Sequence, residues 1–186
     1  MQKKSETYSK FCEFKALVEK ESRKHVKALR SDNGGEFISA EFKDFCSIEG
    51  IRRELIAPHN PQQNGVAERK NRTIVGAVRA MLHDQGLPLH LWAEACNTSV
   101  YVQNHCPHKI LGMSTPEEAF SGKRPDISHL RIFGSPVYMH VMKHARKKLD
   151  PTAEVGIFLG YTDTPHNYRV YFPDNRKIVV RRDIKF

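Results

Sequence analysis

The stretch from His25 to Phe37, with the sequence HVKALRSDNGGEF, decides the fold of the first part of the chain. Apolar and polar side chains alternate up to Leu29, and a period of two residues predicts a β-strand. Asn-Gly-Gly at 33–35 is a strong turn signal, because Asn and Gly tolerate the backbone angles that turns require. Asp32 is therefore expected at the point where a strand ends and the chain bends.

Further elements are predicted on both sides of this stretch. An amphipathic helix is expected over residues 7–20, since its apolar residues recur at helical spacing. A short helix is expected between Ser39, which suits an N-cap, and Gly50, which suits a C-terminal stop. Residues 51–56 are predicted to form a second strand. Residues 57–65 hold two prolines and a glycine, which predicts a loop.

Three helices are predicted in the middle of the chain. The first is long, runs from about Val66 to Gln85, and has an apolar stripe made of Ala67, Ile74, Val78 and Met81. The second has an expected inner face of Leu91, Trp92, Ala95 and Val102. The third begins at the capping box Thr115-Pro116-Glu117-Glu118, with Pro at the first helical position.

The sequence changes character after Phe133-Gly134. Short runs rich in β-formers follow, separated by turn residues, at 137–141, 155–161, 168–172 and 177–180. This spacing predicts a small β-barrel. The expected domains are therefore residues 1–132 and residues 133–186.

Charge and composition limit the classes of function. The chain has 186 residues, with 30 Lys and Arg against 21 Asp and Glu, and a formal net charge of +9. A positive balance points to a polyanionic partner, most often nucleic acid. No apolar run approaches the roughly 18 residues of a membrane span, and the N-terminus does not resemble a secretory signal. We expect a protein that is neither secreted nor inserted in a membrane.

Cysteine and histidine spacing does not favour a zinc site. The cysteines are Cys12, Cys46, Cys96 and Cys106, and none of them forms a C-x-x-C pair. The ten histidines are scattered singly. We therefore predict reduced thiols and no zinc.

Two carboxylates are candidate metal ligands. Asp32 follows a predicted strand, and Glu68 lies in the predicted first turn of the long helix, with 35 residues between the two acids. Carboxylates are the hard oxygen donors that Mg²⁺ or Mn²⁺ needs, and two such ions can assist phosphoryl transfer. The plainer alternative is that Asp32 only makes a turn and that Glu68 pairs with Arg72 four residues later.

The residues around Glu68 favour metal binding over the plainer alternative. Asn and Gln residues at 60–64 precede it, and basic residues at 69–72 follow it. Amide side chains and helix N-termini bind phosphate oxygens, while Arg and Lys supply positive charge. Helix geometry places Arg72 and Arg79 roughly 20–40° around the axis from Glu68.

These motifs resemble the catalytic core of a copia-type integrase of LTR retrotransposons, which is a retroviral-type integrase. The resemblance rests on LRSDNGGEF at 29–37 and PQQNGVAERKNRT at 61–73. Asp32 and Glu68 match the second and third acids of the D, D-35-E triad. The likeness continues through further ordered motifs at 87–88, 91–95, 115–118, 129–134, 158–161 and 182–184.

The resemblance implies an α/β fold, with an RNase H-like integrase core followed by a small SH3-like β-barrel. It implies metal-dependent 3′-processing of element DNA and strand transfer into target DNA, with Asp32 and Glu68 as catalytic residues that hold Mg²⁺ or Mn²⁺. Such enzymes act on DNA as homo-oligomers, in the nucleus or in a cytoplasmic virus-like particle.

One departure from the family pattern leaves the enzyme activity of this chain open. The family's first catalytic Asp lies on a strand before the second acid, but residues 1–31 contain no Asp. The chain therefore resembles a core truncated at its N-terminus, and the two-metal site is expected only in the complete core. The alternatives are a non-catalytic DNA-binding module and a decayed transposon-derived fragment without activity.

The predicted DNA contacts fall in two basic segments. Asn64, Asn71 and Arg72 match positions that contact DNA beside the metal in such integrases, and Arg69 and Lys70 add charge. The second segment, between the first two strands of the expected barrel, contains Lys143, Arg146, Lys147 and Lys148. The alternative for both segments is a set of solvated side chains that bind nothing.

Overall fold

In the computed structural model, the described residues are 6–55, 61–141, 146–148 and 151–186, and for 61–64 the description covers only the backbone. The chain divides into two compact units, Met1–Asn71 and Arg72–Phe186. Helix α4 (Pro61–Asp84) contributes residues to both units. None of the described helices is both long enough and apolar enough to cross a membrane.

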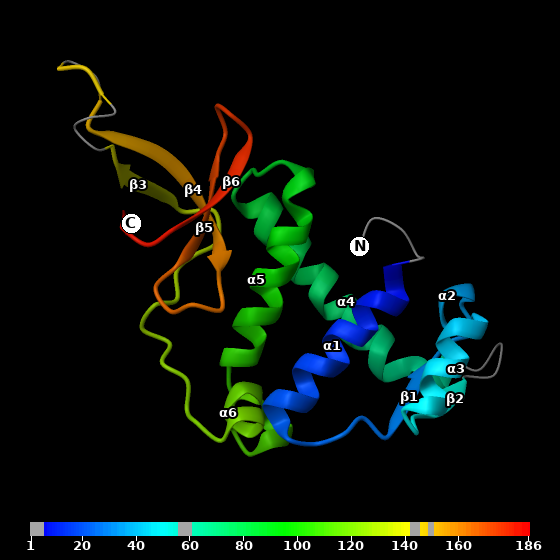
Figure 1. Ribbon diagram of the computed structural model, residues 1–186. Helices are drawn as coiled ribbons and strands as arrows, with labels where there is room; N and C mark the ends of the chain where they lie inside the picture. Colours follow the sequence, from blue (N-terminus) through cyan, green and yellow to red (C-terminus); the bar gives the residue numbers. More distant parts are fainter. Residues whose placement is uncertain (1–5, 56–60, 142–145, 149–150) are drawn as a thin grey trace. The chain divides into compact units, whose positions relative to one another are not determined.

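The first unit contains a pair of parallel strands and the helices around them (Figure 1). Strand β1 (Ala28–Ser31) pairs with β2 (Arg52–Leu55), and Arg30 lies opposite Glu54 in the register. The helices are α1 (Thr7–Ser22), α2 (Gly35–Ile38) and α3 (Ala40–Ile48). The predicted strands are thus confirmed, with the first one beginning three residues later than expected.

An aromatic cluster forms the core of the first unit. Phe42, Cys46 and Ile51 are buried at its centre. The partly buried residues packed around them are Tyr8, Phe11, Val26, Leu29, Phe37 and Phe45. The predicted N-cap is confirmed, since the Ser39 side chain accepts a hydrogen bond from the Phe42 N–H at 3.3 Å.

Helix α4 begins earlier than the sequence indicated. It includes residues 61–65, which we had expected to be loop, whereas residues 57–60 lie outside the described part of the chain. Pro61 suits the first position of a helix because it lacks an N–H that would otherwise be unpaired, and the glutamines that follow are good helix formers. A single internal glycine, Gly65, costs only about 1 kcal/mol.

The remaining helices lie in the second unit. Helix α4 is followed by the 3₁₀ turn η2 (Leu89–Leu91), α5 (Trp92–His105), η3 (Lys109–Leu111) and α6 (Pro116–Ser121). The predicted cap of α6 is confirmed, because the Thr115 hydroxyl accepts the Glu118 N–H at 3.0 Å.

The predicted inner faces of α4 and α5 were partly wrong. Trp92 is 59% exposed, because it is one position along from buried Leu91 and so points about 100° away from it. On α4, Ala67 is exposed, and Leu82, which the prediction omitted, is buried next to Val78.

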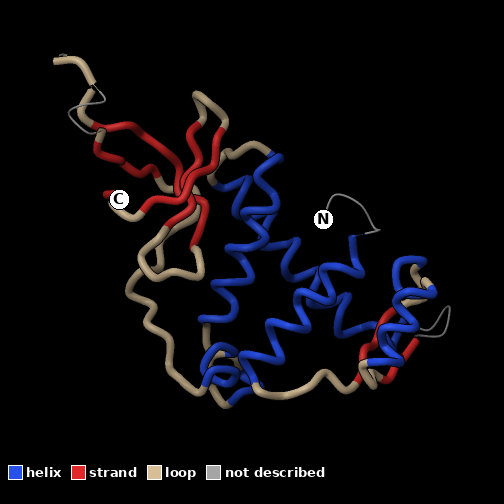
Figure 2. Tube along the Cα trace, viewed as in Figure 1, coloured by secondary structure: helices blue, strands red, loops and turns tan. Residues whose placement is uncertain are grey.

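The last part of the chain forms a five-stranded antiparallel sheet in the order β6-β5-β4-β3-β7. Figure 2 shows these strands gathered near the C-terminus. Its strands are β3 (Pro136–His140), β4 (Ala153–Tyr161), β5 (Tyr168–Phe172), β6 (Lys177–Arg181) and β7 (Ile184–Lys185). The four predicted strands are all present, with small differences at their ends. A register shift between Phe158 and Gly160 interrupts the β4–β5 pairing.

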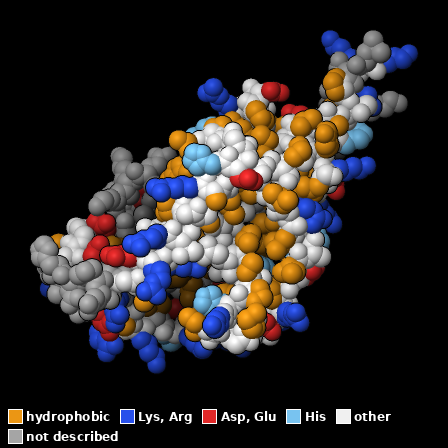
Figure 3. Space-filling view, turned by 180° about the vertical axis from the view of Figure 1, so that it is seen from behind, with side chains coloured by type: hydrophobic (Ala, Val, Ile, Leu, Met, Phe, Trp, Pro, Cys, Tyr) orange, Lys and Arg blue, Asp and Glu red, His pale blue; other side chains and the backbone are white. Residues whose placement is uncertain are grey.

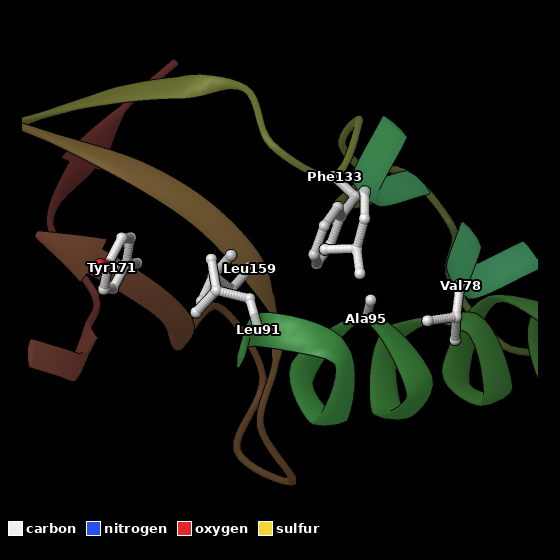
Figure 4. Packing of buried hydrophobic residues seen from close by; sticks show 7 residues of the cluster. Val78, Leu91, Ala95, Phe133, Leu159 and Tyr171 are labelled. Atoms are coloured by element: carbon white, nitrogen blue, oxygen red, sulfur yellow. The ribbon is translucent and has the colours of Figure 1, made fainter. Parts of the chain in front are cut away.

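Each face of this sheet contributes to a different core. One face buries Val137, Phe158, Tyr168, Val170 and Phe172. Side chains from the other face pack against α4 and α5, as Figure 4 shows for Leu159 and Tyr171 beside Leu91 and Ala95. This second cluster also contains Val78, Leu82 and Phe133.

Candidate metal and DNA-binding site

Asp32 is the first residue after strand β1, and its side chain is exposed. Its Oδ1 accepts a hydrogen bond from the backbone N–H of Gly34 at 3.1 Å, so it forms the turn that the sequence indicated. This hydrogen bond uses one carboxylate oxygen, and the other oxygen can bind a metal ion. The turn role and the metal role of Asp32 are therefore compatible.

A second carboxylate, Glu36, lies close to Asp32 and was missed by the sequence analysis. A Cβ atom added to Gly34 would lie 3.0 Å from Asp32 Oδ1 and 3.0 Å from Glu36 Oε2, so these two oxygens are at most twice that distance apart. The glycine at position 34 therefore leaves room for both carboxylates. The four-residue spacing across a turn gave no sequence signal for this proximity.

Glu68 lies near the middle of the first half of α4, and its side chain is exposed. We had placed it in the first turn, but the earlier start of α4 puts it in the second. Within the described part of the chain, Glu68 forms no ion pair with Arg72, the partner that the plainer interpretation required. Its carboxylate thus faces solvent on the side of α4 that also carries Arg72 and Arg79.

The predicted DNA contacts on α4 do not share one face. Arg69, Lys70, Asn71 and Arg72 are all exposed. Successive helix residues lie about 100° apart, so these four side chains surround the axis and Lys70 points away from Glu68. Arg72 is the basic residue best placed beside Glu68. The side chain of Asn64 lies outside the described residues.

The second basic segment connects β3 and β4, as predicted. Lys147 and Lys148 are exposed, whereas Arg146 is half-buried, and Lys143 lies outside the described residues. The Nε atom of Arg146 is buried and has no hydrogen-bond partner among the described residues. Figure 3 shows Lys and Arg side chains distributed over the face seen there, with apolar side chains between them.

The carboxylates have the right chemistry to bind a divalent cation, but too few of the described side chains come together to form a complete site. Among the residues whose placement is described, no three His, Cys, Asp or Glu side chains come together as a metal-binding group. Asp32 and Glu68 offer exposed carboxylates, which are the oxygen ligands that Mg²⁺ and Mn²⁺ prefer. Magnesium commonly keeps several waters and is held by one or two carboxylates together with phosphate oxygens of the substrate.

Two ion pairs of Glu54, one across the strands and one within β2, support the position of Asp32. Arg30 Nη2 lies 2.8 Å from Glu54 Oε2 on the neighbouring strand, and Arg52 Nη2 lies 2.8 Å from Glu54 Oε1. The hydrogen bond and the positive charge of Arg30 hold the pKa of Glu54 below its usual value, and Arg52 acts in the same direction. The end of β1 is thereby tied to β2 immediately before Asp32.

A cluster of Tyr and His side chains in the second unit was also missed. The Tyr101 hydroxyl and His129 Nε2 are 2.7 Å apart, and the Tyr101 ring is stacked on His105 with centroids 4.1 Å apart. Burial, together with the charges of His105 and His166, holds the pKa of His129 below its usual value, and Asp126 opposes this shift. Tyr101 and His105 are four residues apart on α5, but His129 is 28 residues from Tyr101, too far for a sequence pattern to connect them.

This cluster predicts a pH dependence of stability. Because the folded protein favours neutral His129, the unfolded chain binds more protons, and the free energy of unfolding rises with pH. We expect stability to be lost as the pH falls below the ordinary histidine pKa of about 6.5. Urea unfolding between about pH 8 and pH 5 measures this, and His129→Gln should reduce the pH dependence. The exposed His140 supplies the control, because an equal effect of His140→Gln would contradict the assignment to His129.

The chain is similar in sequence to polyproteins of plant transposons. It is 44% identical over 183 residues to the "Retrovirus-related Pol polyprotein from transposon TNT 1-94" of Nicotiana tabacum, which covers 98% of this chain and 14% of the relative. It is 31% identical over 186 residues to the corresponding protein "from transposon RE2" of Arabidopsis thaliana, covering all of this chain and 13% of the relative. The chain thus spans about one seventh of the length of these relatives.

A family model and a solved structure agree with the observed architecture. Residues 135–186 match the model described as "Retroviral polymerase SH3-like domain". The structure of the simian T-cell lymphotropic virus intasome in complex with PP2A regulatory subunit B56 gamma contains a similar chain, with a TM-score of 0.54 and 18% identity. The match covers 100% of this chain and 64% of that one. The predicted fold class, an α/β integrase-type core followed by an SH3-like domain, is confirmed.

The sequence identity extends across both parts of the chain, and the fold agrees with it. The chain is a homologue of the retrovirus-related Pol polyproteins of plant transposons, and its residues 135–186 match the retroviral polymerase SH3-like domain.

Proposed function

We propose that this chain is a segment of a retrotransposon integrase that carries two metal-binding carboxylates, Asp32 and Glu68. In the complete enzyme the activity would be metal-dependent 3′-processing of element DNA and strand transfer into target DNA. The observation that carries this proposal is the identity of 44% with a transposon Pol polyprotein over 98% of the chain, a match long enough to span positions 32 and 68.

The roles of the residues follow from their chemistry. Asp32 and Glu68 would hold Mg²⁺ or Mn²⁺ through carboxylate oxygens, and the bound ion would activate an attacking hydroxyl and stabilise the leaving oxygen. Arg72 and Arg79 lie on the same side of α4 as Glu68 and are exposed, so they are suited to bind phosphate oxygens of the DNA backbone. The chain supplies two of the three acids that the family resemblance implies.

The wider context of the chain is part of the same proposal. We propose a domain boundary between residues 132 and 133, and the match of the SH3-like family model from residue 135 supports it. The proposed partners are element ends, target DNA and further copies of the integrase. The proposed location is the nucleus or a cytoplasmic virus-like particle, because the reaction requires access to element and chromosomal DNA.

An oligonucleotide-joining assay with Mg²⁺ or Mn²⁺ tests the catalytic role of Glu68. We expect residues 1–186 alone to join little or no DNA, since only two of the three acids are present, and Glu68→Gln should abolish whatever joining is measured. The exposed Glu21 on α1 provides a matched control, so Glu21→Gln should leave the signal unchanged. Joining that survives Glu68→Gln would refute the role of Glu68, and robust joining by the unaltered chain would refute the need for a third acid.

A second candidate function is a non-catalytic DNA-binding module. The exposed basic residues at 69–72 and 147–148 and the net charge of +9 favour it. This function requires an affinity for DNA that falls steeply with salt and does not depend on Mg²⁺, because binding to phosphates releases counterions.

The salt dependence of DNA affinity tests whether the basic side chains bind the phosphates of the DNA backbone or are merely solvated. Fluorescence anisotropy with a labelled duplex, between about 50 and 200 mM salt, should show a linear decrease of log K with log salt. Arg72→Gln should reduce the slope by about one, because one phosphate contact is lost. Lys43→Gln, at an exposed position on α3, is the control. An affinity that does not change with salt would contradict DNA binding through these residues.

A further inference from the structure

Helix α5 presents one continuous face to the SH3-like sheet. Residue 91 at the N-cap and residues 95, 98, 101 and 105 follow at intervals of three or four positions, which places them on one side of the helix, and residue 94 lies at the edge of this side. At the start of this face, Leu91 and Ala95 are 1% and 0% exposed and pack in the cluster that contains Leu159 and Tyr171 (Figure 4). The apolar centre of the contact is therefore closed to water.

An ion pair with two hydrogen bonds joins α5 to strand β5 beside this apolar centre. Arg169 Nε lies 2.6 Å from Glu94 Oε2, and Arg169 Nη2 lies 2.7 Å from Glu94 Oε1. The Glu94 side chain is 12% exposed and that of Arg169 is 33% exposed. A paired guanidinium and carboxylate fix both distance and orientation, so this contact allows one alignment of helix and sheet.

Strand β4 makes the next contacts along the same helix face. The Thr98 hydroxyl donates a hydrogen bond to the Leu159 carbonyl at 2.5 Å, and both residues are buried. One turn further on, the Tyr101 ring is stacked on Tyr161 with centroids 4.4 Å apart. Glu94, Thr98 and Tyr101 thus each have a partner on β4 or β5.

We propose that residues 72–186 fold as one cooperative unit in which the sheet face bearing Leu159, Arg169 and Tyr171 is the binding surface for helix α5. Glu94 and Arg169 are the positioning residues that set the alignment of this contact. The SH3-like domain is then not an independent module, although the proposed domain boundary lies between residues 132 and 133. The same face is closed to DNA and to other proteins as long as α5 occupies it.

The chain contains a natural reporter for this proposal. Trp92 is the only tryptophan, it is the first residue of α5, and it is next to both Leu91 and the Glu94 contact. Its fluorescence follows the state of α5 during urea unfolding of the full chain. Hydrogen exchange of the β4 and β5 amides, measured at the same urea concentrations, follows the sheet. We expect one shared midpoint, and a sheet that stays protected after the Trp92 signal is lost would overturn the proposal.

Substitutions in the ion pair test the positioning role. Glu94→Gln and Arg169→Gln should each lower the ratio of folded to unfolded protein by about tenfold, with the same shift in both probes, because each leaves a partly buried charge unpaired. The exchanged pair, Glu94→Arg with Arg169→Glu, should recover part of this loss. Lys10→Gln is the control, since it removes a solvent-exposed ion pair with Glu13 and should shift neither probe.

Each result of the ion-pair substitutions either supports or overturns the positioning role of Glu94 and Arg169. Equal shifts in both probes together with recovery in the exchanged pair support the positioning role. A shift confined to one probe, no shift beyond that of Lys10→Gln, or no recovery in the exchanged pair would overturn it. Glu94→Gln keeps the size of the side chain and one of its two acceptor oxygens, so folding of this variant is expected.

Discussion

Gly160→Ala is expected to lower the free energy of unfolding by about 3 kcal/mol or more, through backbone strain and overpacking together. Gly160 has φ +145°, a conformation that L-residues rarely adopt. A Cβ at this position would lie 2.1 Å from Thr98 Oγ1, well inside van der Waals contact. The substitution therefore pushes β4 away from α5 at a buried point, and urea unfolding measures the loss.

Two further variants separate the causes of this effect. Gly76→Ala is the matched control, because an added Cβ at Gly76 in α4 meets nothing within 4 Å beyond the adjacent residues and backbone of its own helix, and alanine favours a helix by up to about 1 kcal/mol. Thr98→Ala in the Gly160→Ala background should recover part of the loss by removing the clash. A Gly160→Ala protein as stable as the unaltered chain would contradict the close approach of β4 and α5.

Asp32→Asn and Glu68→Gln are each expected to weaken Mn²⁺ binding by at least about tenfold. Loss of residues that merely orient metal ligands costs 10- to 100-fold in affinity, and loss of a direct ligand should cost no less. Asparagine at position 32 retains an oxygen that can accept the Gly34 N–H, so the turn after β1 is preserved. Mn²⁺ titration followed by electron paramagnetic resonance gives the affinity directly.

The controls for this prediction come from acids in similar surroundings. Asp44 on α3 and Glu21 on α1 are exposed, so Asp44→Asn and Glu21→Gln change the net charge by the same amount without altering the site. Binding that weakens equally in all four variants would indicate a general effect of charge. That result would contradict specific coordination by Asp32 and Glu68.

Features fixed by neighbouring residues were predictable from the sequence. The Asp32 turn, the Ser39 cap and the Thr115 cap each depend on hydrogen bonds within three residues, and the structure contains all of them. Four of the five strands of the SH3-like sheet were also predicted, because turn residues separate them clearly, whereas the two-residue strand β7 was not. The start of α4 was missed, since the proline that suggested a loop is also favoured at a helix N-terminus.

Features that depend on tertiary contacts were not predictable. Glu94 and Arg169 are 75 residues apart, and neither residue belongs to a motif that connects them. The burial of Leu82 and the exposure of Trp92 depend on where the sheet contacts the helices, and helical periodicity alone does not define that. The proximity of Asp32 and Glu36 arises from the turn at Gly34, which a linear pattern does not show.

The number of Mn²⁺ ions bound by the single and double variants tests most directly whether Asp32 and Glu68 share a cation. If they do, Asp32→Asn and Glu68→Gln each remove the same ion, and the double variant loses no further ion. Two ions that disappear separately, one with each substitution, would contradict shared coordination and with it the proposed integrase site.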